Sequence, residues 1–299
     1  MERDIVAVVV TYKRKHLLKK NLMALLKQSY KSFDILVIDN NSSDGTYSEV
    51  VAPLLSKYDQ LKYVNTKKNL GGAGGFQFGI RKAHQLNYKY VWLMDDDAIP
   101  APMALEQLIK AYKQLQLKGK VGFLSSKVLW TDGSLCSMNI QRRTLTKNIT
   151  DFSAKYIPCV IASFVSLFIP MQVIEKVGLP IKEFFIWTDD WEYTRRISRL
   201  YPGYVVTDSV VTHETKTNNG ANIATDINER INRYKYAYRN EMYFYRREGF
   251  KGIIHVLLRT PYHIYRVMRY SPDNKKLRVK IILKSTWHGL FFNPKIEMK

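Results

Sequence analysis

Residues 88–97 read Tyr-Lys-Tyr-Val-Trp-Leu-Met-Asp-Asp-Asp, an apolar run that ends in three consecutive aspartates. The run from Tyr88 to Met94 has the length and composition of a buried β-strand. Three adjacent negative charges repel one another, but hard cations such as Mg²⁺ and Mn²⁺ prefer carboxylate oxygens and often bring a phosphate ligand. In α/β sheets, ligands bind beyond the carboxyl ends of strands. We therefore favour a metal–phosphate site at Asp95–Asp97 over a solvated acidic turn.

The N-terminal part of the chain alternates between strand patterns and helix patterns. Aliphatic and β-branched runs predict strands, and leucines at helical spacing or a glycine-rich start predict helices. The predicted strands are Ile5–Thr11, Phe33–Asp39, Leu61–Asn65 and Tyr88–Met94, and the predicted helices are Leu17–Leu26, Thr46–Lys57 and the stretch from the glycine-rich Asn69–Gly75 to Leu86. Such alternation indicates βαβ units, so we predict an α/β fold with a mainly parallel sheet flanked by helices.

The rest of the chain is more mixed and then becomes basic. Residues 121–215 contain apolar runs at Val121–Trp130 and Cys159–Ile169 and a predicted helix from about Asp190 to Leu200. From Asn232 onward, Arg and Lys are interleaved with aromatic and aliphatic residues, and Pro261 is expected to interrupt any single helix there. We predict two parts: residues 1–231 as the α/β domain and residues 232–299 as a basic, aromatic-rich helical region.

The composition excludes several classes of protein. Two cysteines, Cys136 and Cys159, give neither a disulfide framework nor metal-ligand spacing, which suits a reducing compartment. No signal-peptide pattern opens the chain, because the first apolar run, Ile5–Thr11, is too short. The longest mostly apolar run, Tyr156–Pro170, falls short of the about 20 residues that span a bilayer. We therefore expect a cytoplasmic protein without membrane-spanning segments.

The charge of the chain is strongly positive and unevenly distributed. The formal net charge is +21, and residues 232–299 contribute +12 of it, with 16 Lys and Arg against 4 Asp and Glu. Such an excess implies an anionic partner, which could be nucleic acid, an anionic membrane surface or a phosphorylated substrate.

The glycine-rich segment Gly71-Gly72-Ala73-Gly74-Gly75 fits neither common nucleotide fingerprint. A dinucleotide-binding G-x-G-x-x-G that started at Gly72 would need glycine at Gln77, and no Gly-Lys-Ser/Thr follows for a P-loop. These failures exclude an NAD-dependent oxidoreductase. The segment predicts either a loop that approaches an anionic ligand at a helix N-terminus or a purely structural tight turn.

A second acidic cluster lies in the segment Trp187-Thr188-Asp189-Asp190-Trp191-Glu192-Tyr193. An aspartate between aromatic walls and beside a like charge has its basicity raised, as a general base acting on a hydroxyl requires. The alternative is an N-cap for the following helix, and we expect one of the two aspartates to serve that purpose. His213 follows the apolar run Tyr204–Thr212. It is either a structural histidine or a third ligand of the predicted metal.

Together these segments resemble family 2 glycosyltransferases of the GT-A fold, a Rossmann-like α/β architecture. The matching segments occur in the family's order over residues 1–215: VVVTYKR (Val8–Arg14), VIDNNSSDGT (Val37–Thr46), NLGGAGGF (Asn69–Phe76), WLMDDD (Trp92–Asp97), WTDDWEY (Trp187–Tyr193) and His213. The glycine-rich segment and Trp-Thr-Asp-Asp look most like the galactofuranosyltransferase branch, with rhamnosyltransferases as close neighbours. Tyr234–Tyr245 (YKYAYRNEMYFY) also resembles a segment of these enzymes.

The resemblance assigns roles to individual residues. It implies that Asp95, Asp97 and His213 bind a divalent metal, Mn²⁺ or Mg²⁺, on the donor diphosphate. Asp190 matches the catalytic base, with Asp189 orienting it or contacting the acceptor, and Trp187 and Trp191 could stack on sugars. The implied donor-binding residues are Thr11, Arg14, Asp39, Asn69, Gly71, Gly72 and Asp96.

The resemblance also implies the reaction and its partners. One base and no second nucleophile indicate a single displacement with inversion, in which a hexosyl group moves from a nucleotide sugar to a hydroxyl. UDP-galactofuranose is the favoured donor and dTDP-rhamnose the alternative, and the acceptor would be a glycan or a polyprenyl-diphosphate-linked glycan.

The basic region suggests peripheral binding to an anionic membrane at its cytoplasmic face, or else a helical cap with a solvated charged surface. From another class, a nucleic-acid-binding protein would also fit basic residues interleaved with aromatics. The acidic clusters at Asp95–Asp97 and at Asp189 and Asp190 argue against it, because they would repel a phosphate backbone.

Overall fold

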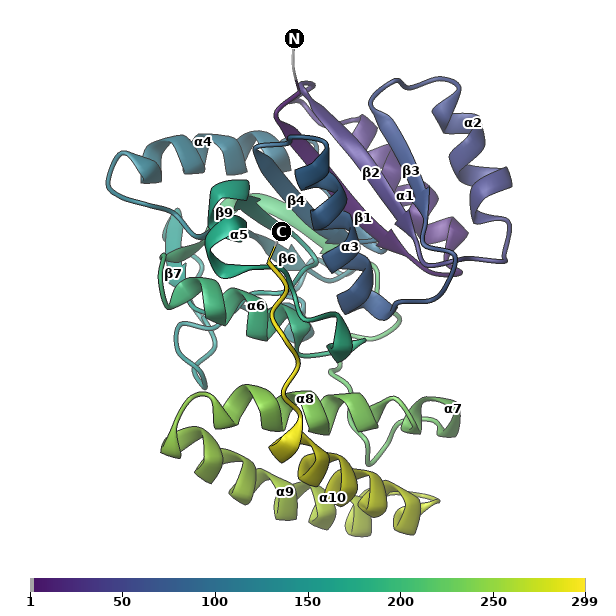
Figure 1. The fold of residues 1–299 in the computed structure, drawn as a ribbon, viewed down its shortest axis with the longest axis vertical. Helices are drawn as coiled ribbons and strands as arrows, with labels where there is room; N and C mark the ends of the chain where they lie inside the picture. The colour runs from purple at the N-terminus through teal and green to yellow at the C-terminus, as the bar shows by residue number, and fades with distance from the viewer. Residues whose placement is uncertain (1–2, 299) are drawn as a thin grey trace. The chain divides into compact units, whose positions relative to one another are not determined.

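The computed structural model describes residues 3–298, and their contacts divide the chain into two compact units (Figure 1). The first, here called the sheet unit, contains the residues up to Lys182, Asp190–Asn218 and the end of the chain from Ile296. The second, the helical unit, contains Glu183–Asp189 and Asn219–Lys295. A short segment from the middle of the chain, Glu183–Asp189, therefore belongs with the C-terminal helices.

The sheet unit is built on one mixed sheet. Within residues 3–298 it has nine strands, of which eight follow the order β3-β2-β1-β4-β8-β6-β9-β5 while β7 pairs with β9. The strands are β1 Ile5–Thr11, β2 Phe33–Asp39, β3 Leu61–Asn65, β4 Tyr90–Asp95, β5 Ala98–Pro100, β6 Phe123–Leu129, β7 Tyr156–Cys159, β8 Leu167–Pro170 and β9 Gly203–His213. The four strands from β3 to β4 are parallel, and β8 joins this half by antiparallel pairing with β4. The predicted α/β architecture is confirmed.

Helices cover both faces of this sheet. They are α1 Lys15–Leu26, α2 Ala52–Leu55, α3 Gly71–Gln85, α4 Ala104–Gln116, α5 Met171–Val177 and α6 Asp189–Ser198. Helices α1 and α4 pack on one face, and α3, α5 and α6 pack on the other. Strand β1 alternates between the two cores, because Ala7 and Val9 point to the first face whereas Val6 and Val8 point to the second.

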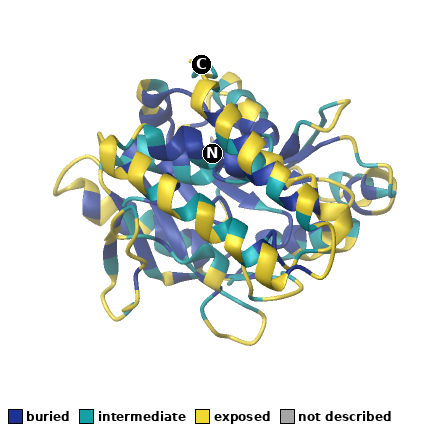
Figure 2. Ribbon diagram, turned by 90° about the horizontal axis from the view of Figure 1, so that it is seen from below, coloured by how far each residue is buried: buried dark blue, intermediate teal, exposed yellow. Residues whose placement is uncertain are grey.

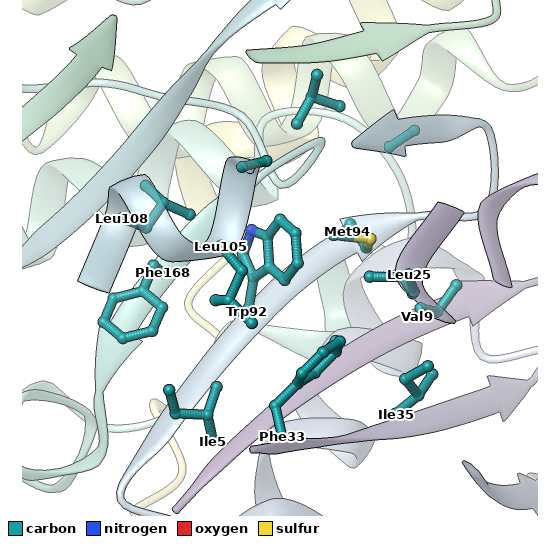
Figure 3. Packing of buried hydrophobic residues seen from close by; sticks show 14 of the residues in the cluster. Ile5, Val9, Leu25, Phe33, Ile35, Trp92, Met94, Leu105, Leu108 and Phe168 are labelled. Atoms are coloured by element: carbon teal, nitrogen blue, oxygen red, sulfur yellow. The ribbon is translucent and has the colours of Figure 1, made fainter. Parts of the chain in front are cut away.

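The strand that precedes the aspartates is anchored in the first core. Trp92 is fully buried among Leu105, Leu108 and Phe168, and Met94 lies farther along the same strand toward Val9 and Leu25 (Figure 3). The Trp92 indole N–H donates a hydrogen bond to the Ser166 hydroxyl, 2.9 Å away, so its polar atom is also satisfied. The end of β4 is thereby held in a rigid position.

The glycines of α3 serve two different purposes. A Cβ on Gly79 would lie 2.4 Å from Val8 Cγ1, and one on Gly75 would lie 2.6 Å from Val10 Cγ1. These glycines let the helix approach β1 closely. In contrast, a Cβ on Gly72 would meet no atom within 4 Å. Close packing explains the later glycines of α3, and Gly72 faces open space at the start of the helix.

The helical unit has its own small core. Its helices are α7 Asn228–Ile231, α8 Tyr234–Arg246, α9 Phe250–Tyr270 and α10 Lys275–Phe291. Tyr238, Val267 and Ile282 are buried together. The buried Arg278 guanidinium donates to the carbonyl of Asp226 at 3.0 Å and to the Asp273 carboxylate at 2.6 Å. No helix within residues 3–298 is both long enough and apolar enough to cross a bilayer.

Two expectations about helices are corrected. Helix α9 continues through Pro261, because both Pro261 and Leu257, four residues earlier, are exposed and water can solvate the carbonyl that loses its partner. The predicted helix Thr46–Lys57 is instead a π-helical segment, Thr46–Val51, followed by the short α2. Gly45, just before the segment, has a left-handed φ of 85°, and Pro53, in the first turn of α2, has no N–H to donate to the Glu49 carbonyl, so a regular α-helix is interrupted.

We expect Gly79→Ala to destabilise the protein because the added methyl group would collide with Val8 and Ile38. Overpacking of this kind costs about 1–3 kcal/mol, which lowers the Tm by roughly 3–10 °C. The matched control is Gly72→Ala in the same helix, which has space for the methyl group and should leave the Tm unchanged or slightly raised. Equal Tm values for the two variants in differential scanning calorimetry would contradict this account.

Candidate active site

The parallel strands align several of the predicted residues at one edge of the sheet. In the registers of β1 with β2 and β4, Thr11 lies opposite Asp39, and Val10 lies opposite Asp95. The carboxyl ends of the three strands therefore coincide, as expected for a ligand site in an α/β sheet.

His213 reaches this edge through antiparallel pairing of the short strand β5 with β9. Ala98 pairs with His213, which brings the histidine next to Asp97, 116 residues away in the sequence. His213 Nε2 lies 3.1 Å from Asp97 Oδ1, and the backbone N–H of Glu214 donates to the Asp97 carbonyl at 2.9 Å. Asp95, Asp97 and His213 each offer one ligand atom, and these atoms lie within 4.8 Å of one another.

Arg14 and His213 are the two neighbouring cations, and they neutralise the negative charge of the aspartates only in part. Arg14 Nη1 donates to Asp97 Oδ2 at 2.6 Å and to Asp96 Oδ1 at 3.3 Å, and the Thr11 hydroxyl donates to Asp96 Oδ2 at 2.7 Å. Burial raises the pKa of Asp96 to about 6, although Arg14 acts in the opposite direction. Burial and the charge of Asp97 raise the pKa of Asp95. The cluster thus favours additional positive charge.

The surroundings of His213 favour its protonated form. Burial is the largest single influence and lowers the pKa of His213, but the hydrogen bonds to Asp97 and Cys136 and the charges of Asp97 and Asp95 together outweigh it and raise the pKa to about 10. At Asp97 burial acts to raise the pKa, but the hydrogen bond and charge of His213 together with the charge of Arg14 outweigh it and lower the pKa of that carboxyl. The proton on Nε2 occupies the position where a metal ion would bind, so a cation would have to replace it.

The three side chains fit a divalent cation. Two carboxylates and one imidazole are a ligand set that suits Mn²⁺ as well as Mg²⁺. Ligand atoms bound at about 2.1 Å to one ion lie up to about 4.2 Å apart, so the observed spacing requires only small side-chain movements.

Asn139 contacts the candidate site and was not revealed by the sequence. Its Oδ1 lies 2.7 Å from His213 Nδ1 and also accepts a hydrogen bond from the Cys136 thiol at 3.1 Å. An amide oxygen at Nδ1 keeps the proton on that nitrogen and leaves Nε2 for a ligand. Asn139 lies in a short 3₁₀ turn, Ser137–Asn139, whose sequence carries no recognisable motif.

The other predicted donor-binding residues lie at the ends of β2 and α3. Asp39 is buried, with Oδ1 accepting from the Ser42 N–H and Oδ2 from the Tyr63 hydroxyl, both at 2.8 Å. Asn69 Oδ1 accepts from the Gly71 N–H at 2.9 Å, and Gly71 has a positive φ of 72°. The Asn40 amide donates to the Gly71 carbonyl at 2.9 Å. Asn40 therefore connects the glycine-rich segment to the end of β2.

The second acidic cluster forms the first turn of α6. Asp189 is buried and Asp190 is half-buried, and Asp190 Oδ1 accepts a hydrogen bond from the Trp191 N–H at 2.8 Å. The Trp191 ring lies 3.8 Å from the Arg142 guanidinium. Trp187 belongs to the helical unit, where its ring packs against Tyr234 at 5.0 Å between centroids.

The fold is of the GT-A type. Similar solved structures include Staphylococcus aureus TarS 1–349 in complex with UDP (TM-score 0.56, 13% identity, 98% of this chain and 73% of that chain). Another is the mannosyltransferase PcManGT from Pyrobaculum calidifontis in complex with GDP-Man and Mn²⁺ (TM-score 0.58, 17% identity, 99% and 77%). At these identities the likeness establishes the fold.

The sequence comparisons match the N-terminal part of the chain to one family. Residues 6–128 match Glycosyl transferase family 2. The galactofuranosyltransferase GlfT1 of Mycolicibacterium smegmatis is 28% identical over 264 residues, which is 83% of this chain and 85% of that protein. The chain is thus similar to family 2 glycosyltransferases over residues 6–128 and to the galactofuranosyltransferase branch over most of its length.

We expect Mn²⁺ binding to depend on pH because the ion must displace the proton of His213. With a pKa of about 10 in the free protein, each pH unit between pH 8 and pH 6 should weaken binding by up to about tenfold. Isothermal titration in buffers of different ionisation enthalpy measures both the affinity and the proton release.

Two variants test whether the Mn²⁺ measured in this titration binds at the cluster of Asp95, Asp97 and His213. His213→Ala should weaken Mn²⁺ binding at pH 7 and remove the part of the pH dependence that arises from the imidazole, while the raised pKa of Asp95 leaves the remainder. His84→Ala is the control and should change neither the Mn²⁺ affinity nor its pH dependence. His84 lies on α3 and contacts Glu175 of α5. A pH-independent affinity in the unmodified protein would contradict the assignment of His213 as a ligand.

Proposed function

We propose that this protein is an inverting, metal-dependent hexosyltransferase that moves galactofuranose from UDP-galactofuranose to a hydroxyl group of a glycan or a polyprenyl-diphosphate-linked glycan. Such a reaction would serve bacterial surface polysaccharide synthesis. The cluster of Asp95, Asp97 and His213 at the carboxyl edge of the sheet is the observation that carries the proposal. The similarity to GlfT1 supports the sugar, and the similarity to UDP-bound TarS supports the nucleotide. A dTDP-rhamnose-dependent enzyme of the same fold is the second candidate.

The proposed chemistry follows from where charge develops. Cleavage of a sugar–phosphate bond builds negative charge on the leaving diphosphate, and a divalent cation held by Asp95, Asp97 and His213 would stabilise it. Asn139 orients His213 through Nδ1. Arg14 carries a second positive charge at the same site. These residues would act on the donor side of the reaction.

Asp190 is the proposed general base on the acceptor side. It would remove the proton of the incoming hydroxyl group as that oxygen attacks the anomeric carbon from the face opposite the diphosphate. A single displacement of this kind inverts the anomeric configuration. Asp189 would orient the base or contact the acceptor, and the rings of Trp187 and Trp191 would contact sugars.

Asp190→Asn should lower turnover by at least ~100-fold while leaving the affinity for UDP within about twofold, because the amide cannot accept the proton. Turnover is measured as UDP release from UDP-galactofuranose with Mn²⁺, with dTDP-rhamnose as the comparison donor. Asp208→Asn is the matched control and should remain fully active. Asp208 is an exposed residue of β9 that pairs with Lys155. Near-normal turnover in Asp190→Asn would exclude Asp190 as the base.

We further propose that the helical unit binds an anionic membrane surface from the cytoplasmic side. Along α9 an exposed apolar stripe repeats at helical spacing and comprises Phe250, Ile254, Leu257, Leu258, Tyr265 and Met268. Helix α10 adds Leu283, Trp287, Leu290 and Phe291. Figure 2 shows that exposed residues recur along the long helices. Exposed apolar stripes of this length are typical of interaction surfaces.

The charges beside these stripes favour a lipid surface as the partner. Lys276, Lys280 and Lys284 are exposed at four-residue spacing on α10, next to the row that contains Trp287. Basic side chains beside aromatic and aliphatic ones suit the interface of an anionic leaflet, where each Lys or Arg near the surface contributes about 1 kcal/mol. Such a position would place the enzyme near a lipid-linked acceptor.

Replacing Leu257 and Leu258 together with glutamate should reduce retention on phosphatidylglycerol-containing liposomes by about 10-fold or more, because two exposed leucines lose their insertion into the interface. Cosedimentation at several salt concentrations measures retention. Leu117→Glu, at a leucine of the sheet unit that is 86% exposed, is the control and should bind normally. Equal retention of all proteins, or binding that does not weaken with salt, would exclude this surface.

A further inference from the structure

The segment that leads into the second acidic cluster has an unusual backbone. Three non-glycine residues within four positions, Phe185, Trp187 and Thr188, have positive φ angles of 65°, 67° and 68°. For L-amino acids each such residue costs about 1–2 kcal/mol. A conformation of this kind persists only where surrounding groups hold it, so the contacts that hold this segment are informative.

Asn240 on α8 supplies the most direct of these contacts. Its side chain is fully buried, and Nδ2 lies 3.0 Å from the Phe184 carbonyl, 3.1 Å from the Ile186 carbonyl and 2.9 Å from the Trp187 carbonyl. One amide group therefore contacts three carbonyl oxygens of the segment Phe184–Trp187. Within the segment, the Phe184 carbonyl also accepts from the Ile186 N–H at 2.7 Å.

The neighbouring arginine fixes the orientation of this amide. Arg239 donates from Nε and Nη2 to Asn240 Oδ1 at 3.0 and 2.8 Å, so the oxygen faces the guanidinium and the amide hydrogens face the carbonyls. Arg239 Nη2 also donates to the Glu183 carbonyl at 2.5 Å. Two adjacent residues of α8 therefore hold the backbone from Glu183 to Trp187.

Aromatic contacts from the same helix complete the arrangement. Phe185 stacks on Tyr236 with ring centroids 4.8 Å apart, and Trp187 packs on Tyr234. The residues after this segment are Thr188, with positive φ, and then Asp189 and Asp190, which begin α6.

We propose that Asn240 is a positioning residue for the transfer reaction: it fixes the strained segment Phe184–Thr188 and thereby the orientation of Trp187 and the start of α6, where Asp189 and Asp190 lie. The inference rests on the proposed function for its catalytic consequence. Its structural part, the restraint of the segment by the Asn240 amide, is independent of the reaction.

The test replaces Asn240 with aspartate, which has the same shape but presents an oxygen to three carbonyl oxygens. Tyr238→Phe is the matched control on the same helix, because the part-buried hydrogen bond that it removes is made to His263, which lies outside the segment. Hydrogen exchange of the amides of residues 184–189, the Tm, the Kd for UDP with Mn²⁺, and kcat for UDP release from UDP-galactofuranose are compared.

Asn240→Asp should accelerate amide exchange in residues 184–189 at least about 10-fold and lower kcat at least about 10-fold, with the Kd for UDP within about twofold. Tyr238→Phe should change neither the exchange nor kcat, even where it lowers the Tm. If Asn240→Asp does not fold, Arg239→Gln should give smaller changes in the same direction, because the amide loses the donors that orient it.

Unchanged exchange in residues 184–189, or equal losses of kcat in Asn240→Asp and Tyr238→Phe, would overturn the inference. If the unmodified protein does not release UDP from the donor, the proposed function fails. In that case exchange in residues 184–189 still decides whether Asn240 restrains the segment.

Discussion

The contact between Asp97 and His213 is the constraint on which the rest of the site depends. It joins the end of β4 to the end of β9 across 116 residues of sequence, and it exists because Ala98 pairs with His213 in the antiparallel β5–β9 ladder. The carboxylates of Asp95–Asp97 would be unfavourable at a buried strand end without nearby cations. His213 and Arg14 supply two, against the three carboxyl groups of Asp95, Asp96 and Asp97. Burial, together with the charge of Asp97, raises the pKa of Asp95 and Asp96. This surplus of carboxyl groups over cations is what makes the cluster a candidate cation site.

The sequence predicted the parallel half of the sheet well because each of its strands is a continuous apolar run closed by polar residues. Ile5–Thr11, Phe33–Asp39 and Leu61–Asn65 have the predicted bounds. The strands of the antiparallel half of the sheet were harder to predict from the sequence. Strand β5 has only three residues, and β7 and β8 flank an apolar segment, Val160–Ser166, that has strand composition but no ladder of its own. Helix α9 passes through Pro261, and both the proline and Leu257, whose carbonyl it leaves without a partner in the helix, are exposed residues. The sequence did not show that Pro261 would lie on the solvated side of the helix.

Site residues that stand together in a short sequence segment could be predicted. Site residues that only strand pairing or the fold brings together could not. Asp95 and Asp97 stand out as adjacent carboxylates, and strand periodicity alone places them at a sheet edge. His213 could be suggested as a ligand, but only the β5–β9 pairing brings it to Asp97. Asn139 had no signal, since a single asparagine in an irregular turn is common and its role depends on the distance of 2.7 Å to His213. The glycines of α3 resolved into Gly75 and Gly79, which permit close packing on β1, and Gly72, which faces open space.

The C-terminal sequence shows how one composition can serve two structural purposes. Basic and aromatic residues recur throughout residues 232–299, yet the structure separates them by face and by helix. On α8 they point inward: Arg239, Tyr234 and Tyr236 surround the segment Glu183–Trp187. On α9 and α10 the apolar and basic rows are exposed. A region that resembles a simple basic extension in sequence therefore contains both a restraint on a strained loop and a solvent-facing surface. The division follows from burial, which neither net charge nor residue frequency reports.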